Sequence, residues 1–171
     1  MEYPLIEHNE RKFFYAVVYY EGVIEEVIKK MKFHGMKILA KDLSNILFNF
    51  IHKEQISFDF VGYVPMTRKE LLERKFNQTH LVAKEISKTF NKPLINSIKK
   101  LKTTRKQVGL TKKERKENLK NAFQMKEKIS GNVLLIDDVY TTGSTAREIV
   151  KSVSKTINGN IIFVAISRKI D

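Results

Sequence analysis

The segment from 133 to 145 reads Val133-Leu134-Leu135-Ile136-Asp137-Asp138-Val139-Tyr140-Thr141-Thr142-Gly143-Ser144-Thr145. It joins an apolar run to two adjacent acids and then to five hydroxyl or glycine positions. The apolar run predicts a short strand over 132–136 of the kind that is buried in a parallel sheet. We expect a loop over 137–143, because polar and glycine residues replace the apolar ones there.

The residues after this segment extend the pattern. Apolar residues recur at helical spacing from 144 to 157, and Asn158-Gly159 should end that helix. A second apolar run, 161–166, predicts another buried strand. This strand–loop–helix–strand order predicts an α/β fold with a right-handed crossover. Ligands of open α/β sheets bind at the carboxyl ends of the strands, and the 137–145 loop is expected there.

The chemistry of the loop indicates a ribose phosphate. The carboxylates of Asp137 and Asp138 can accept hydrogen bonds from vicinal hydroxyls, and the hydroxyl residues around Gly143 can donate hydrogen bonds to a phosphate. The loop then enters a helix, whose free N–H groups and dipole favour an anion. Acceptors for a diol, followed within a few residues by a phosphate cradle, match a ribose 5-phosphate.

The segment has two other interpretations. An ordinary strand-to-helix turn capped by Ser or Thr explains Thr142-Gly143 alone, but not the diacid in the same register. An ATPase strand ending in an acid also fits, but it requires a Gly-x-x-x-x-Gly-Lys-Ser/Thr loop upstream. None of the seven glycines forms that loop or a Gly-x-Gly-x-x-Gly sequence.

The composition is that of one globular domain with a basic surface. The chain has 171 residues, a net charge of +13 and no cysteine, which excludes disulfides and cysteine-ligated zinc. The positive charge favours polyanionic partners, although a basic proteome would give the same balance. No apolar run approaches the roughly 20 residues of a membrane span, and the N-terminus does not resemble a secretory signal. We therefore expect a cytoplasmic protein without membrane insertion.

The remaining pattern predicts a single domain, 1–171, with an N-terminal helical hood (1–57) and a core (58–171). A strand is expected over 13–20, followed by two amphipathic helices that are separated near His34-Gly35. A second strand should cover 58–64, and a helix should begin after Asn77, which is a good N-cap residue.

A basic segment interrupts the core. Between 97 and 120 only two acids oppose ten basic residues: Lys99, Lys100, Lys102, Arg105, Lys106, Lys112, Lys113, Arg115, Lys116 and Lys120. The first part has no apolar periodicity and predicts a long mobile loop, while Thr111-x-x-Glu114 has the form of a capping box that begins a short helix. The segment contains no aromatic residue, so it lacks the stacking platforms of a single-stranded DNA channel.

These motifs resemble a known family. The 133–145 segment is similar to the diphosphoribosyl-binding motif of type I phosphoribosyltransferases. Further motifs resemble those of the competence-associated ComF family, and they run in order as Lys32-Phe33-x-Gly35, Val64-Pro65-Met66, Arg74-Lys75-Phe76-Asn77-Gln78, Gln107-x-x-Leu110, Arg115-x-x-Asn118 and Ala122-Phe123. The resemblance extends from about residue 20 to the C-terminus.

The resemblance implies a type I phosphoribosyltransferase-like fold, a central mostly parallel sheet flanked by helices, with a long mobile lid loop over 99–118. It implies that 5-phosphoribosyl 1-diphosphate, or a nucleotide, binds with Mg²⁺ held mainly by the ligand and water, with Asp137 and Asp138 as candidate protein ligands. Asp137, Asp138 and Arg115 are the candidate catalytic residues. The candidate ribose 5-phosphate residues are Asp137, Asp138, Val139, Tyr140, Thr141, Thr142, Gly143, Ser144 and Thr145. The candidate pyrophosphate and lid residues are Met66, Thr67, Arg68, Arg74, Gln107, Arg115 and Asn118.

The sequence also departs from the family pattern. The four-cysteine zinc module with which many members begin has no counterpart in it, and Lys75 stands where the family has glycine. Thr141 stands where 6-oxopurine transferases carry an acid, which argues against purine salvage.

The sequence is compatible with three functions. The chain could be a phosphoribosyltransferase with an unknown acceptor, a competence module that binds single-stranded DNA weakly, or a regulator that senses a nucleotide. Competence proteins are expected partners by resemblance, and a homodimer is left open.

Overall fold

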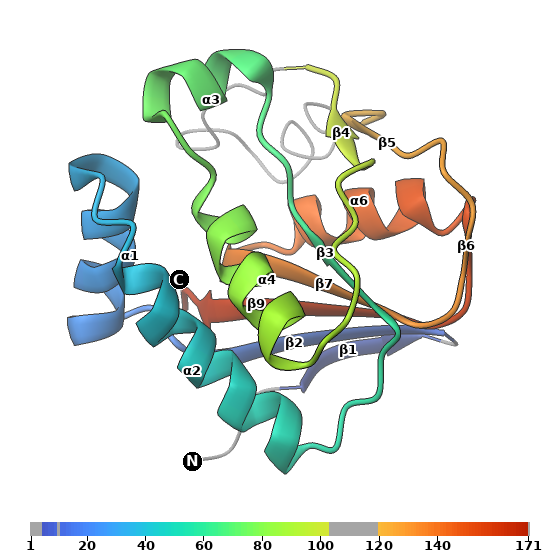
Figure 1. The fold of residues 1–171 in the computed structure, drawn as a ribbon, viewed down its shortest axis with the longest axis horizontal. Helices are drawn as coiled ribbons and strands as arrows, with labels where there is room; N and C mark the ends of the chain where they lie inside the picture. The colour runs from blue at the N-terminus through green and yellow to red at the C-terminus, as the bar shows by residue number, and fades with distance from the viewer. Residues whose placement is uncertain (1–4, 10, 103–119, 171) are drawn as a thin grey trace.

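A five-stranded sheet forms the centre of the computed structural model, which describes residues 5–9, 11–102 and 120–170. The strand order is β1-β2-β9-β7-β3 (Figure 1). The strands are β1 (Leu5–Asn9), β2 (Lys12–Tyr19), β9 (Ile161–Arg168), β7 (Val133–Tyr140) and β3 (Phe60–Tyr63). The pairs β2–β9, β9–β7 and β7–β3 are parallel, and β1 pairs antiparallel with β2. The expected α/β class with a mostly parallel sheet is therefore confirmed.

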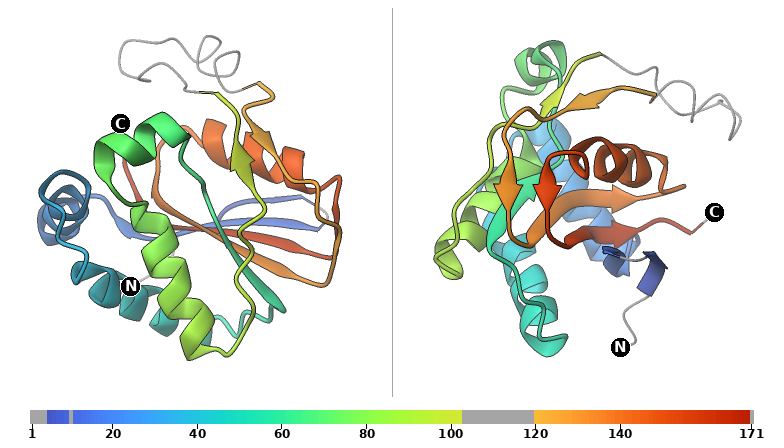
Figure 2. Two further views of the ribbon diagram at one scale, coloured as in Figure 1. Left: turned by 45° about the horizontal axis from the view of Figure 1, so that its top comes forward. Right: turned by 90° about the vertical axis from the view of Figure 1, so that its right-hand side faces the viewer.

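Helices cover both faces of this sheet (Figure 2). They are α1 (Gly22–His34), α2 (Leu39–Lys53), α3 (Arg68–Arg74), α4 (Gln78–Thr89) and α6 (Ser144–Val153). Two short strand pairs lie outside the main sheet, β4 (Lys99–Lys100) with β5 (Phe123–Gln124), and β6 (Ile129–Ser130) with β8 (Ile157–Asn158). Among the described helices, none combines the length and apolar character that crossing a bilayer requires.

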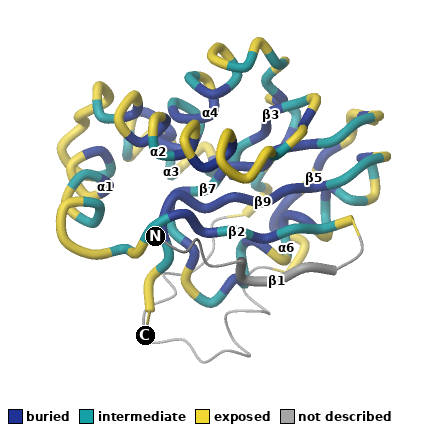
Figure 3. The backbone as a smooth tube through the Cα atoms, turned by 90° about the horizontal axis from the view of Figure 1, so that it is seen from below, coloured by how far each residue is buried: buried dark blue, intermediate teal, exposed yellow. Residues whose placement is uncertain are grey.

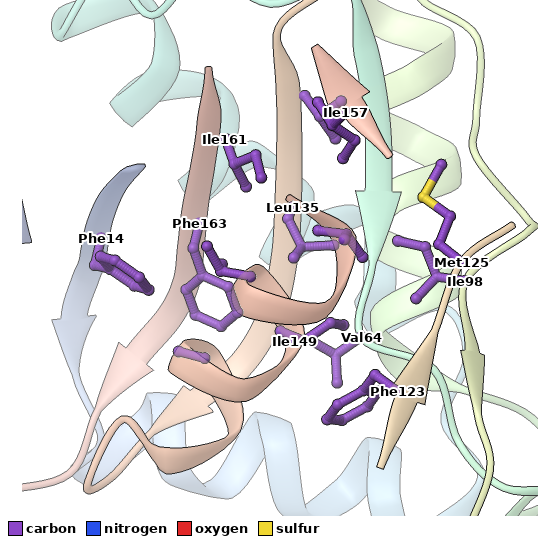
Figure 4. Packing of buried hydrophobic residues seen from close by; sticks show 14 of the residues in the cluster. Phe14, Val64, Ile98, Phe123, Met125, Leu135, Ile149, Ile157, Ile161 and Phe163 are labelled. Carbon is purple, nitrogen blue, oxygen red and sulfur yellow. The ribbon is translucent and has the colours of Figure 1, made fainter. Parts of the chain in front are cut away.

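Successive side chains of β7 point to opposite faces of the sheet, so the core has one layer on each face. Leu135 points to the face covered by α6, where it joins Ile149 and Phe163 (Figure 4). Leu134 and Ile136 belong to the opposite cluster, which includes the buried residues of α2 and α4. Both layers bury β7 and β9 almost completely (Figure 3), as expected for central parallel strands.

Two expectations about element bounds were wrong, and one helix was not expected. β7 continues to Tyr140, because its pairing with β9 extends to Tyr140 and Arg168, so the diacid lies within the strand and not in a loop. The helix after it ends at Val153, since the chain turns there into β8. The sequence pattern also missed α3, which begins at Thr67 through a capping box with Glu70.

The carboxyl ends of the four parallel strands lie along one edge of the sheet. The residue after each strand is Tyr20 for β2, Val64 for β3, Thr141 for β7 and Lys169 for β9. Strands that run in the same direction place the segments after them together, so this edge is where the fold can build a binding site.

Candidate phosphoribosyl site

A cavity of about 500 Å³ lies at this edge of the sheet. All four residues that follow the parallel strands line it, together with both acids of β7 and cationic side chains from other elements. Its lining is Tyr20, Lys32, Val64, Arg74, Lys100, Phe123, Asp137, Asp138, Val139, Thr141, Thr145 and Lys169. The sequence-predicted diacid and two of the predicted phosphate residues, Thr141 and Thr145, therefore share one cavity.

Two side chains from helices hold the carboxylate of Asp138, which lies in β7. Lys32 of α1 places its Nζ 2.6 Å from Oδ2 of Asp138, and Gln78 of α4 donates from Nε2 to the same oxygen at 2.6 Å. Burial by itself would raise the pKa of Asp138, but the charge and hydrogen bond of Lys32 and the hydrogen bond of Gln78 outweigh burial and lower that pKa. Asp138 is therefore ionised at neutral pH.

Asp137 has the opposite environment. Its Oδ1 accepts a hydrogen bond from the backbone N–H of Asp138 at 2.8 Å. Burial, followed by the negative charge of Asp138, raises the pKa of Asp137 to about 7. Two adjacent carboxyl groups thus titrate in different ranges, and Asp137 can take up or release a proton near neutral pH.

The turn between β7 and α6 forms a cradle around Gly143. This residue is the N-cap of α6, with φ of 72°, and no side chain caps the first N–H groups of the helix. A Cβ at this position would lie 2.1 Å from the hydroxyl oxygen of the buried Tyr140. Arg147 donates to the carbonyl oxygen of Thr142, so the turn is held from the helix side. The cradle therefore requires glycine, and it presents helix N–H groups that suit an anion.

Four positive side chains from different segments of the chain line the cavity. They are Lys32 of α1, Arg74 of α3, Lys100 of β4 and Lys169 after β9. Lys100 is also bonded to both carboxylate oxygens of Glu70, at 2.8 and 3.1 Å. This charge complements a ligand that carries several phosphate oxygens.

The other predicted pyrophosphate residues have different positions. Met66 and Arg68 line a neighbouring cavity of about 760 Å³, which shares Lys100 with the first. Thr67 is buried and its hydroxyl accepts the N–H of Glu70 as the cap of α3. Gln107, Arg115 and Asn118, with most of the expected lid, lie outside the described residues.

Among the charged and amide side chains that the fold brings to the site, sequence reasoning missed four: Lys32, Gln78, Lys100 and Lys169. Lys32 and Gln78 are part of motifs that the sequence analysis quoted, and those motifs were the available signal for them. Lys169 directly follows the last parallel strand, so its position was implied by strand order. Lys100 was one of ten similar basic residues, and nothing in the sequence singled it out.

The donor set at the cavity fits Mg²⁺ only in company with a ligand. Within the described ranges no three His, Asp or Glu side chains come together as a metal cluster. Asp137 and Asp138 still offer hard carboxylate oxygens at the cavity, and Mg²⁺ commonly takes one or two carboxylates and completes its shell with substrate phosphates and water.

Comparison with known proteins reveals homologues. The chain is 32% identical over 141 residues to Competence protein F of Haemophilus influenzae, which covers 75% of this chain and 61% of that protein. It is 29% identical over 143 residues to the DNA utilization protein YhgH of Escherichia coli, and 29% identical over 135 residues to Competence protein ComFC of Bacillus subtilis. The chain belongs to the ComF/ComFC family. It covers 63% of the YhgH protein and 53% of the Bacillus protein, so it spans about three fifths or less of these relatives.

This ComF/ComFC protein was also compared with protein-family models and with solved structures. No protein-family model matches it. Among solved structures, it is similar to an adenine phosphoribosyltransferase from Leishmania donovani, with a TM-score of 0.49 and 10% identity over 96% of this chain and 86% of that one. It is also similar to a glutamine phosphoribosylpyrophosphate amidotransferase from Bacillus subtilis, with a TM-score of 0.43 and 16% identity over 75% of this chain and 25% of that one.

Proposed function

We propose that this protein binds 5-phosphoribosyl 1-diphosphate with Mg²⁺ in the cavity at the carboxyl edge of the sheet, and acts as a phosphoribosyltransferase. One observation carries the proposal: an acid pair, Thr145 from the first turn of a helix without a side-chain cap, and four cations line the same cavity. Each of these three groups matches a different part of the ligand. The competence and DNA-utilization names of its relatives support a role for this activity in the handling of DNA.

The acid pair suits the ribose. Asp138 is held ionised by Lys32 and Gln78, so it is a ready acceptor for a hydroxyl. Asp137 lies beside it, and its pKa of about 7 allows it to accept a hydrogen bond when ionised or to donate one when protonated. Two vicinal hydroxyls would therefore contact one carboxylate that accepts hydrogen bonds and one carboxyl group that can accept or donate them.

The ends of the ligand suit the two sides of the cavity. The 5-phosphate fits the Thr141–Thr145 turn, where Gly143 allows the close approach of Tyr140 and no side chain caps the first N–H groups of α6. The diphosphate fits Arg74 and Lys100, which can stabilise the negative charge that develops when the bond to C1 of the ribose breaks. Mg²⁺ on the diphosphate would add positive charge at the same leaving group.

Calorimetric titration of 5-phosphoribosyl 1-diphosphate in the presence of Mg²⁺ tests the proposal. The wild type should bind, and the Asp137→Asn/Asp138→Asn variant should lose most of the affinity, because each lost charged hydrogen bond contributes roughly 1.5–3 kcal/mol. Glu127→Gln removes an exposed carboxylate between β5 and β6 and serves as the matched control. Equal affinities for the wild type and the double variant would overturn the assignment.

A further inference from the structure

Three consecutive polar residues are buried where α4 begins. Asn77, Gln78 and Thr79 expose 6%, 5% and 3% of their surfaces. Buried polar side chains need hydrogen-bond partners, so the partners show what such residues do. We propose that Gln78 is a positioning residue of the phosphoribosyl site, which holds the carboxylate of Asp138 in the orientation that accepts a ribose hydroxyl. This inference rests on the proposed phosphoribosyl ligand.

The partners of Asn77 and Thr79 fasten the helix. The side-chain oxygen of Asn77 accepts the backbone N–H of Thr79 at 2.9 Å and the hydroxyl of Thr79 at 2.7 Å. The side-chain nitrogen of Asn77 donates to the carbonyl oxygen of Val64 at 3.0 Å. These bonds cap the first turn of α4 and join it to the end of β3, so they account for the burial of both residues.

The side chain of Gln78 reaches the central strand β7 instead. Its Nε2 donates to Oδ2 of Asp138 at 2.6 Å, and Nζ of Lys32 lies 2.6 Å from the same oxygen. Lysine brings its charge on a flexible stem, whereas the amide of glutamine is planar and donates in fixed directions. The Lys32 side chain also keeps 18% of its surface exposed, while Gln78 is buried. Gln78 is therefore the more rigid partner, and it fixes the direction of Oδ2.

The other end of the amide supports a functional role. Oε1 of Gln78 is buried, and within the described part of the chain it has no hydrogen-bond partner. A buried acceptor without a partner lowers stability. Turning the amide round would place Oε1 against the carboxylate of Asp138, where two acceptors would repel each other. An apolar side chain of similar size would avoid this loss, so stability alone does not explain a glutamine at this position.

Gln78 acts on a ligand through Asp138. Asp138 is among the described residues that line the phosphoribosyl cavity, and Gln78 is not. The bonds to Oδ2 set the plane of the carboxylate, and the plane determines how the group faces the cavity. A ligand with ribose hydroxyls should therefore respond to a change at Gln78, and a ligand that has only the diphosphate part should not.

Calorimetry with the full chain tests the inference on Gln78→Met, which keeps an unbranched side chain of similar length and removes the amide. The two probes, each with Mg²⁺, are 5-phosphoribosyl 1-diphosphate, which has the ribose hydroxyls, and pyrophosphate, which lacks them. Gln78→Met should bind the sugar about tenfold more weakly, which is the usual effect of removing a partner that orients a binding group. Its affinity for pyrophosphate should stay within twofold of the wild type.

Thr79→Val is the matched control, because it removes a buried hydroxyl from the same turn of α4 that bonds to Asn77 and not to Asp138. It should lower the melting temperature and leave both affinities within twofold of the wild type. A crystal structure of Gln78→Met should show the Asp138 carboxylate turned from its wild-type orientation.

The outcomes separate this inference from the proposed function. If the wild type binds the sugar and Gln78→Met binds it within twofold as tightly, the inference alone is overturned. The same holds if Gln78→Met loses sugar and pyrophosphate affinity equally, if Thr79→Val loses as much sugar affinity, or if the Asp138 carboxylate keeps its orientation. If the wild type itself does not bind the sugar, the proposed function fails and the inference is overturned with it.

Discussion

Asp137 and Asp138 are adjacent in the sequence, yet the fold gives their carboxyl groups different pKa values. Burial and the charge of Asp138 raise the pKa of Asp137 from 3.8 to about 7, so the folded state favours its protonated form. The contribution of Asp137 to stability is therefore full below about pH 4 and is lost as the pH rises through 7. Asp137→Asn keeps the acceptor oxygen but cannot ionise. The variant should melt above the wild type at about pH 8, and this advantage should vanish near pH 4.

Thermal unfolding across that pH range measures the effect, with Glu127→Gln as the exposed-carboxylate control. A melting-temperature difference that is constant with pH would contradict the raised pKa of Asp137.

Gly143 makes a second prediction at the residue scale. Gly143→Ala introduces a strained φ of 72° and also a Cβ 2.1 Å from the hydroxyl oxygen of Tyr140. Gly35→Ala is the matched control, since Gly35 has φ of 69° but nothing within 4 Å of an added Cβ. The control should lose about 1–2 kcal/mol from backbone strain alone. Urea unfolding should show a larger loss for Gly143→Ala, and equal losses would mean that the cradle tolerates a side chain.

The sequence alone predicts the acids and the glycine of the site, because they are contiguous and chemically distinctive. It does not predict that Lys32 and Gln78 hold Asp138, since Gln78 is 60 positions away and Lys32 lies still earlier in the chain. Tertiary packing of α1 and α4 creates those contacts, and no local pattern encodes them.

At the scale of elements, the ion pair between Glu70 and Lys100 joins α3 to β4 at the cavity. Burial would raise the pKa of Glu70, but the bonds from Lys100 and Thr67 lower it, so the pair stabilises the fold above the ordinary pKa of 4.5 and this stability is lost as the pH falls. Glu70→Gln keeps a side-chain oxygen for the capping box, because Gln also serves at that position, and it removes the charge and one of the two oxygens that accept from Lys100. At neutral pH we expect a loss of about 1 kcal/mol in stability and tighter binding of pyrophosphate, since Lys100 is released.

Urea unfolding and calorimetry with pyrophosphate and Mg²⁺ measure the two effects of Glu70→Gln. Glu25→Gln breaks an exposed pair with Lys29 within α1 and should change neither quantity appreciably. Weaker pyrophosphate binding by Glu70→Gln would show that Glu70 positions Lys100 and does not neutralise it.

Elements with a strong apolar period were predictable, and the others were not. The two strands and the helix around the diacid were expected, apart from their ends. The helix α3 has no buried residue, so it leaves no apolar period, and its capping box Thr67-x-x-Glu70 was the signal available. The strands β4, β5, β6 and β8 have two residues each and are too short to show alternation.

For the molecule as a whole, the strand–helix–strand order predicts an α/β fold but not the complete sheet. The segment assigned to the N-terminal hood contributes β2, which pairs with β9 near the C-terminus. This pairing brings Tyr20 to the lining of the cavity. Contacts between the two ends of a chain depend on the packed core, which periodicity cannot specify.

A crystal structure of the protein with 5-phosphoribosyl 1-diphosphate and Mg²⁺ tests the central claim most directly. The account predicts the ribose hydroxyls on Asp137 and Asp138, the 5-phosphate in the turn from Thr141 to Thr145, and the diphosphate beside Arg74 and Lys100. A ligand bound elsewhere, or a sugar whose 5-phosphate lies away from Gly143, would contradict it.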